Sequence, residues 1–397
     1  MRILHGIRFG AIAILLTGCA SMKRLPPPGN PLVMAEIPGI PGCRIWGDNP
    51  PIDETERRAL LVAQIKASPQ FDPREDIHML AISGGAQEGA FGAGVLTGWT
   101  ASGERPQFRV VTGISAGSLL APFAFLGPDY DQVLRDLSSK YETRDLIDSR
   151  YLGALFRGSS LSTNKKVRKL LTTYFTPVEM ERIAQEYAMG RRLFIGSTHL
   201  DTVRPVIWDI GAIAASGDPK AYDLIVDAIL ASAAFPGVFP PVIVDVEQDG
   251  VPYQELHVDG GLTSQVFAYA LDTDIRKVLE ELGVTGRTHV YVLRNAVIVP
   301  RVKEISPRTI PILMQTAFSM VNTLALMNIQ YIYHDALEDG MVFHLAYIPS
   351  DFREPAEMYD PSYMMELFDL GYQRAKAGYP WETQPPLFWQ QSTRLLE

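Results

Sequence analysis

From residue 78 onward, the chain alternates short apolar runs, typical of buried strands, with longer stretches that have helical spacing. The apolar runs predict strands at 78–83, 108–114, 191–199, 204–209, 253–258, 289–295 and 341–348. The helical spacing predicts helices at 53–67, 88–99, 116–125, 219–231 and 361–376. This alternation indicates an α/β fold in which helices cover a mainly parallel central sheet.

The stretch 309–334 differs from the rest because it carries no charge when His is neutral and is rich in Leu, Met, Ile and Phe. Its length would suit a membrane span. Polar residues interrupt it, however, and Gln315, Ser319, Asn322 and Thr323 lie near one helical face. We expect a buried helix here, with a lipid-contacting surface helix or a true span as the alternatives.

The N-terminus has a cationic start, a short apolar run and small residues, which together indicate a secretory signal over residues 1–18. The apolar run is too short to span a bilayer stably. The ending Leu-Thr-Gly-Cys19 resembles the bacterial lipobox, which implies that the Cys19 thiol receives a diacylglycerol and becomes the mature N-terminus. Ala20, rather than Asp, follows, which implies sorting to the outer membrane of a Gram-negative cell envelope. An uncleaved anchor helix or a chance match is the alternative.

Proline is frequent between residues 20 and 50, which disfavours helices and predicts a semi-extended tether. We therefore expect a tether and lead-in helix at 19–75, a catalytic domain at 76–385 and a C-terminal tail at 386–397. With Cys19 acylated, Cys43 has no partner for a disulfide within the chain. We expect Cys43 to be a small buried residue, with intermolecular pairing as the alternative.

The composition is that of an ordinary globular protein, with 397 residues of which 47% are hydrophobic and 20% charged. Removal of residues 1–18 removes Arg2 and Arg8 but no acid, so the formal net charge falls from −9 to −11. Such a surface offers no general attraction to nucleic acid or to anionic headgroups. Proximity to a membrane must therefore come from the lipid anchor.

The pentapeptide Gly113-Ile-Ser115-Ala-Gly117 lies between a predicted strand and a predicted helix. Glycines on both sides of the serine permit a strained turn that lifts its hydroxyl away from the backbone. The helix that follows directs its N-terminal amides toward a developing anion. Ser115 is therefore the candidate nucleophile.

A glycine turn, Gly84-Gly85-Ala86, follows the strand at 78–83. A dinucleotide-binding fold also opens in this way, but its fingerprint requires glycine at position 86. The roughly 30 residues between this turn and Ser115 are typical of a βαβ unit, in which both strands end at the same sheet edge. The three amides of the turn would then lie beside Ser115, where they can bind an oxyanion.

The strand at 253–258 ends in Asp259-Gly260-Gly261, which by itself is typical of a turn. The segment Ala-Ser-Ala-Ala-Phe-Pro-Gly-Val-Phe-Pro-Pro precedes it at 231–241. Taken in order over residues 76–262, these motifs resemble the patatin-like phospholipase family. The motif glycines are Gly89, Gly113, Gly117 and Gly260.

The resemblance implies a three-layer α/β/α sandwich and a Ser-Asp dyad. Ser115 would be the nucleophile and Asp259 the general base, with the oxyanion bound at Gly84, Gly85 and Ala86. The substrates implied are acyl esters of membrane lipids, cleaved through an acyl-enzyme, and no metal or cofactor is expected. The activity expected is that of a phospholipase A or lysophospholipase.

Two residues depart from the family pattern of three glycines followed, after one residue, by Arg or Lys. Ala86 stands at the third glycine and suits the loop if its φ is negative. Glu88 stands at the basic position, which removes a cation near the site. Neutral acyl esters are therefore as plausible as phospholipids.

Other functions stay open at this point. His257 shares a strand face with Asp259, and His289, His334 and His344 follow in the order of a Ser-Asp-His hydrolase. The short separation between the glycine turn and the nucleophile favours the dyad. Acyl transfer or thioester cleavage on the same dyad, or a non-catalytic lipoprotein that binds acyl chains or protein partners, are the further alternatives.

Overall fold

A computed structural model describes residues 24–48, 54–140, 164–268, 275–299, 301–302, 304–355 and 359–386. The predicted signal peptide, Cys19, and the predicted tail apart from Pro386 lie outside these residues. One sheet contains β1 (Arg44–Trp46), β2 (Ile77–Ile82), β3 (Val110–Ile114), β4 (Arg192–His199), β5 (Arg204–Asp209), β6 (Val242–Gln248), β7 (Val251–Asp259), β8 (Thr288–Val297) and β9 (Val342–Ile348).

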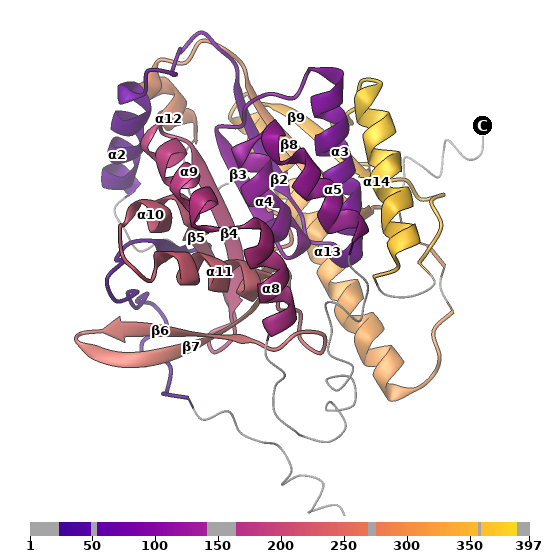
Figure 1. Cartoon of the computed structure of the whole chain (residues 1–397), viewed down its shortest axis with the longest axis horizontal. Coiled ribbons are helices and arrows are strands. Elements are labelled where there is room, and N and C mark those ends of the chain that lie inside the picture. The colour runs from indigo at the N-terminus through magenta and orange to yellow at the C-terminus, as the bar shows by residue number, and fades with distance from the viewer. Residues whose placement is uncertain are drawn as a thin grey trace, which may run out of the picture.

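The α-helices are α2 (Glu54–Ala67), α3 (Gly89–Ser102), α4 (Ala116–Leu126), α5 (Asp131–Ser139), α8 (Lys165–Tyr174), α9 (Pro177–Ala188), α10 (Ile210–Ala215), α11 (Ala221–Ser232), α12 (Ile275–Leu282), α13 (Thr309–Glu338) and α14 (Pro361–Lys376). Short 3₁₀ turns are η1 (Ala86–Glu88), η2 (Pro128–Tyr130) and η3 (Gly260–Leu262). Figure 1 shows these helices on both sides of the sheet.

The centre of the sheet is parallel, in the order β4-β3-β2-β8-β9. At one side β5 pairs antiparallel with β4, and β1 pairs antiparallel with β5. β7 pairs antiparallel with β4 and with β6. The antiparallel strands β4 and β5 are joined by a short turn, which parallel strands cannot be. The prediction of a mainly parallel α/β sheet is confirmed.

Alternate residues of the central strands pack on opposite faces, as the period of two requires. Leu80 and Ile82 of β2 belong to the core beneath α3, α4, α11 and α14. Met79 and Ala81 of the same strand belong to a second core that includes residues of α13. The result is a sheet between two helical layers, consistent with the expected three-layer sandwich.

Residues 24–48 do not form the predicted tether. β1 pairs with β5, and Trp46 and Cys43 are 2% and 1% exposed. Arg44 forms a buried ion pair with Glu255 of β7, and Arg24 pairs with Asp201. The prediction failed because proline content reports the absence of helix but says nothing of packing. The expectation that Cys43 is buried is confirmed.

The prediction of a buried helix over 309–334 is wrong, although the helix itself, α13, is present. By length and composition α13 could cross a membrane, but only 12% of its most apolar stretch is buried. Ile329, Ile332 and Ala336 pack on the sheet. The side away from the sheet is also apolar, and its large side chains are exposed.

Candidate active site

Ser115 stands in a strained turn between β3 and α4, with φ of 53° and ψ of −122°. The turn is tight: a Cβ on Gly117 would lie 2.3 Å from the Ile82 carbonyl oxygen, and one on Gly113 would lie 2.5 Å from the Gly117 carbonyl oxygen. Both positions of the motif therefore require glycine. Ser115 itself remains half-buried, so its side chain is accessible from one side.

Asp259, at the end of β7, lies directly against this serine. Ser115 Oγ donates a hydrogen bond of 2.7 Å to Asp259 Oδ2, and the Gly261 amide donates one of 2.7 Å to Oδ1. The Asp259 amide donates to the Ala234 carbonyl at 3.0 Å, which joins the 231–241 segment to the site. Ser232 Oγ accepts from the Ser115 amide at 2.9 Å. The structure thus brings together the two residues that the sequence motifs selected.

Asp259 is 1% exposed, and its carboxyl has no cationic partner in the described part of the chain. Burial raises its pKa to about 7, and the hydrogen bonds from Ser115 and Gly261 oppose this rise. An ordinary aspartate, with a pKa of about 3.9, is a poor base for a hydroxyl. The environment therefore makes Asp259 a stronger base than aspartate in water.

The glycine turn lies beside the serine, because β2 and β3 are parallel neighbours. A Cβ on Gly84 would lie 3.1 Å from Ser115 Cβ. The Gly84 amide, however, donates to the Gln265 carbonyl at 3.2 Å, which corrects the expectation that it faces an oxyanion. The amides of Gly85 and Ala86 remain as the candidate oxyanion donors. Ala86 is the first residue of η1, so its amide has no acceptor within that turn.

Ala86 has φ of 49°, in the left-handed region. The condition under which alanine would suit the loop, a negative φ, is therefore not met. A side chain in this conformation costs about 1–2 kcal/mol, which glycine would avoid. The loop keeps the backbone shape that suits a third glycine even though the glycine is absent.

The end of β8 supports the glycine turn from below. Asn295 Nδ2 donates to the Ser83 carbonyl at 2.9 Å, and Asn295 Oδ1 accepts from the Gly92 amide at 3.0 Å. A Cβ on Gly85 would lie 2.1 Å from the Asn295 carbonyl oxygen, so glycine is required there for close approach. Asn295 belongs to no motif in the sequence, and only the pairing of β2 with β8 identifies it.

Arg294 adds a cation that the sequence did not reveal. It is 3% exposed, its Nη2 donates to Asn322 Oδ1 of α13 at 2.7 Å, and its Nη1 lies 3.4 Å from the Gly84 carbonyl oxygen. Burial raises the pKa of Glu88 to about 7, against the attraction of Arg294. Glu88 therefore removes the cation of the family pattern, but Arg294 places another cation beside the glycine turn.

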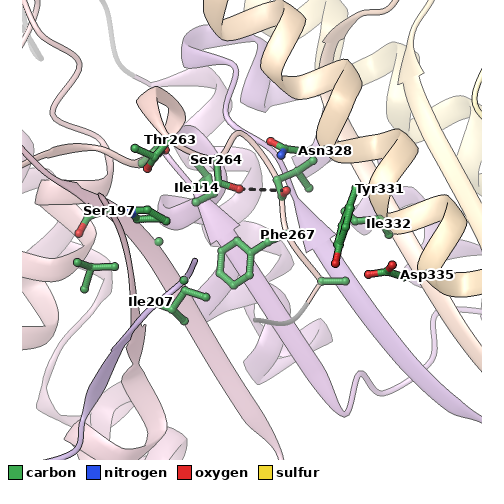
Figure 2. A pocket seen from close by; sticks show the side chains of 17 residues that line it. Ile114, Ser197, Ile207, Thr263, Ser264, Phe267, Asn328, Tyr331, Ile332 and Asp335 are labelled. Atoms are coloured by element: carbon green, nitrogen blue, oxygen red, sulfur yellow. Dashed lines mark hydrogen bonds between the residues drawn. The ribbon is translucent and has the colours of Figure 1, made fainter. Parts of the chain in front are cut away.

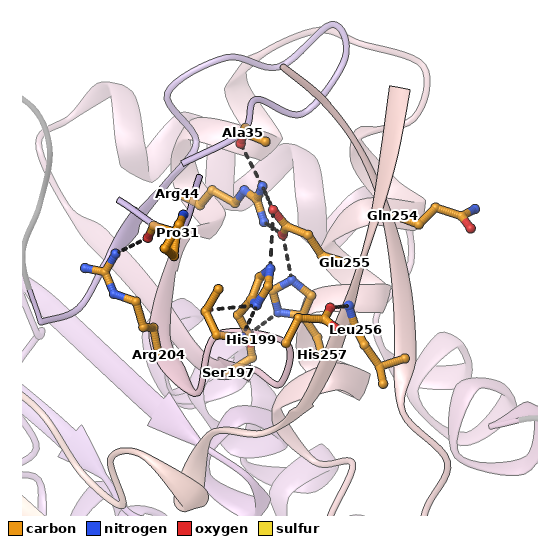
Figure 3. Close-up of polar contacts among 12 residues, drawn as sticks. Pro31, Ala35, Arg44, Ser197, His199, Arg204, Gln254, Glu255, Leu256 and His257 are labelled. Atoms are coloured by element: carbon orange, nitrogen blue, oxygen red, sulfur yellow. Dashed lines mark hydrogen bonds and ion pairs between the residues drawn. The ribbon is translucent and has the colours of Figure 1, made fainter. Parts of the chain in front are cut away.

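No imidazole lies between Ser115 and Asp259, whose oxygens bond directly. His257 Nδ1 lies 3.0 Å from Ser197 Oγ, and its Nε2 lies 3.0 Å from Glu255 Oε2 (Figure 3). Burial lowers the pKa of His257 to about 4, so the ring is neutral at pH 7. Ser197, His257 and Glu255 resemble a triad in their order of contacts, but all three are at most 1% exposed.

The other histidines lie elsewhere. His289 and His344 contact each other at 2.9 Å near the amino ends of β8 and β9, at the opposite edge of the sheet from Ser115. His334 is exposed on α13. The alternative of a Ser-Asp-His triad therefore has no support in the geometry.

An open pocket lies on the face of the sheet that carries α13 (Figure 2). Its lining is mainly apolar and includes Ile114, Ile207, Phe267, Tyr331 and Ile332. Ile114 and Gly260, the chain neighbours of Ser115 and Asp259, line it, whereas the two dyad residues do not. The pocket therefore lies behind the dyad rather than in front of it.

Residues 80–272 match the family model described as patatin-like phospholipase. No curated protein matches the chain. Among solved structures, the crystal structure of VipD from Legionella pneumophila is similar, with a TM-score of 0.35 and 12% sequence identity. That match covers 77% of this chain and 66% of the VipD chain, and a likeness this weak supports no argument about function.

Proposed function

Because residues 80–272 form a patatin-like phospholipase domain, we propose that this chain hydrolyses acyl esters of lipids with Ser115 as nucleophile and Asp259 as general base. The family supports lipid acyl hydrolysis in general terms. The observation that carries the residue assignment is the direct hydrogen bond of 2.7 Å between Ser115 Oγ and Asp259 Oδ2. A general base must lie within this reach of the proton it removes.

In the proposed reaction, Ser115 Oγ attacks the ester carbonyl carbon while Asp259 accepts the hydroxyl proton. The amides of Gly85 and Ala86 stabilise the oxyanion that forms. The bond to the leaving alcohol then breaks, and that alcohol takes the proton from Asp259. Water then attacks the acyl-enzyme while Asp259 accepts its proton. The bond between the acyl group and Ser115 Oγ breaks, the fatty acid leaves, and Asp259 returns the proton to Ser115 Oγ.

Transfer of the acyl group to another alcohol, or cleavage of a thioester, would use the same acyl-enzyme. Hydrolysis is the main proposal because it needs only water as acceptor. A non-catalytic role is disfavoured, since a buried carboxylate without a cation is costly and, over the residues that the structure describes, Asp259 has no ion pair to offset that cost.

The proposal also includes the cellular location of the protein. The N-terminal signal and Cys19 support a lipoprotein of the bacterial envelope, anchored in the outer membrane. Its test is Cys19→Ser, for which we expect an unprocessed precursor without lipid label. Normal processing and labelling of that variant would remove the anchor from the account.

The enzymatic part is tested with acyl esters of graded chain length, measured for the wild type and for Ser115→Ala. We expect turnover by the wild type and none above background by the variant, with the fold of both checked by circular dichroism. Esterase activity that persists in Ser115→Ala would mean that another residue is the nucleophile.

A further inference from the structure

The exposed side of α13 carries a stripe of large apolar side chains. Leu313, Met320 and Met327 follow one another at intervals of two helical turns and are 62%, 69% and 65% exposed. Ile329 and Ile332, on the other side, pack on the sheet. A helix that is apolar on both sides is not a surface helix in water, which would present a polar face to solvent.

A second group of exposed apolar side chains lies where the N-terminal segment docks. Leu25 and Leu32 are 45% and 74% exposed, and Val203, in the turn after β4, is 68% exposed. Arg24 pairs with Asp201 in that turn, and the Pro31 carbonyl accepts from Arg204 at 2.7 Å. These contacts bring the exposed side chains of both segments together in one patch.

Both groups lie at the edge of the sheet that carries the dyad. The turn after β4 is at this edge because β3 and β4 are parallel and Ile114, which precedes Ser115, pairs with Gly196. The N-terminal half of α13 reaches it too, since Phe318 stacks on Phe235 at 5.3 Å between ring centroids. In Figure 1, the N-terminal half of α13 and the first described residues of the chain both lie toward the lower side of the view.

We propose that these two apolar groups rest on the surface of a phospholipid bilayer, with α13 lying in the interface, so that the site around Ser115 opens toward the membrane. This inference rests on the proposed function, since it names the surface from which that site takes its substrate. An interfacial helix of this kind binds by burying apolar side chains among headgroups and acyl chains.

The chain outside the described residues supports the same orientation. A lipid on Cys19 would be joined to Arg24 by at most about 18 Å of extended chain. Arg24 is itself fixed to the domain through Asp201, so the anchor would hold this edge close to the bilayer. The stripe then needs no attraction between charges, which suits an acylated chain whose formal net charge, after loss of Arg2 and Arg8 with residues 1–18, is −11.

The first experiment measures the depth of single labels in the full acylated chain, reconstituted in phosphatidylcholine vesicles. Met320→Cys carries an environment-sensitive fluorophore, and Leu60→Cys on α2, 58% exposed and at the far end of the molecule in Figure 1, is the control. Cys43 should not react, because burial raises the pKa of its thiol to about 12.

We expect lipids brominated on their acyl chains to quench more than about half of the fluorescence at position 320 and little at position 60. The quenching should be the same at low and high salt, because it reflects apolar burial. A blue shift without quenching would overturn the proposal in favour of a second copy covering the stripe. Neither a shift nor quenching would show that the stripe faces water.

The second experiment compares turnover of vesicle phospholipid with turnover of a soluble short-chain ester. For the variant Leu313→Gln/Met320→Gln/Met327→Gln, the ratio of the two should fall about tenfold or more relative to the wild type, and Leu60→Gln should not change it. An unchanged ratio would contradict membrane docking. A failure of the proposed function can be distinguished from a failure of membrane docking. If only the proposed function fails, the soluble ester is not turned over, but the quenching persists, also when it is measured in Ser115→Ala.

Discussion

Glu255 and Asp259 are two buried carboxylates on the same face of β7, and their surroundings give them opposite properties. Burial would raise the pKa of both. At Glu255 the guanidinium of Arg44 and hydrogen bonds from His199 and His257 outweigh burial and hold the pKa far below its usual range. Among the described residues, the Asp259 carboxylate accepts hydrogen bonds from Ser115 and Gly261 alone, and burial raises its pKa to about 7.

The difference shows how one strand supplies both a structural ion pair and a base. Figure 3 shows the Glu255 side chain surrounded by donors. A carboxylate stabilised in this way has little tendency to accept a proton, whereas one that lacks a cation has more. Ser197, His257 and Glu255, which resemble a triad, thus form part of the buried network that stabilises the fold.

The largest effect is expected for Asp259→Asn. Asparagine keeps the shape of the side chain but cannot accept the Ser115 proton, so kcat should fall at least about a hundredfold and up to about ten-thousandfold. The matched variant Glu255→Gln should change kcat per folded molecule by no more than about threefold. Steady-state kinetics on a soluble ester check both, and a loss as large in Glu255→Gln as in Asp259→Asn would erase the distinction.

Arg44→Met should have the next largest effect, on stability rather than on activity. It leaves Glu255 buried without its cation, which typically costs about 3–5 kcal/mol of unfolding free energy. Chemical denaturation measures this loss. The double variant Arg44→Met/Glu255→Met should recover part of it, because no unpaired charge then remains. A loss below about 1 kcal/mol would show that the pair is not a structural one.

The pH dependence of stability should separate the two carboxylates. Because the folded-state pKa of Asp259 is raised, its contribution to stability is present below about pH 4 and is lost as the pH rises through about 7. Asp259→Asn should remove this loss of stability.

The effect of Glu255 on stability has the opposite sign, because its folded-state pKa is lowered. Its contribution to stability is present above about pH 4.3, the pKa of an unfolded glutamate, and is lost only in stronger acid. Thermal unfolding from about pH 2 to about pH 9 tests both signs, because it covers the acid range for Glu255 and the neutral range for Asp259. Identical profiles for wild type and Asp259→Asn would contradict the first.

The smallest effect is expected at the glycine turn. Ala86→Gly relieves the left-handed φ of 49° and should raise the unfolding free energy by about 0.5–1 kcal/mol, because the strain relieved exceeds the added flexibility of the unfolded chain. The rate of ester hydrolysis should change only a few-fold. A clear loss of stability would mean that the alanine methyl makes a contact more valuable than the strain it causes.

The parts of the site that follow directly from local sequence were predictable. The spacing between the glycine turn and Ser115 predicted that two strands end at the same edge of the sheet. The glycines at 113 and 117 predicted a tight turn, which the structure contains. Asp259 came from the order of motifs rather than from spacing. What joins these segments in space is the pairing of β4 with β3 and β7, which a local pattern does not encode.

Other features could not be read from the pattern. Arg294 and Asn295 support the glycine turn from a strand more than 200 positions away, and nothing near them in the sequence marks this role. The apolar run of α13 does not say which of its sides is covered, so its exposure was missed. The strand β1 was not predicted, because it lies in a proline-rich segment and forms by pairing with β5, which is distant in the sequence.

The rate at which a fluorophosphonate labels Ser115, followed as a function of pH, tests the central claim most directly. The dyad predicts labelling at Ser115 alone, with a rate that rises through about pH 7 as Asp259 loses its proton. Asp259→Asn should suppress this rate at every pH, while His257→Gln and His334→Ala should leave the profile in place. Labelling of a different serine, or a profile abolished by a folded histidine variant and untouched by Asp259→Asn, would contradict the account.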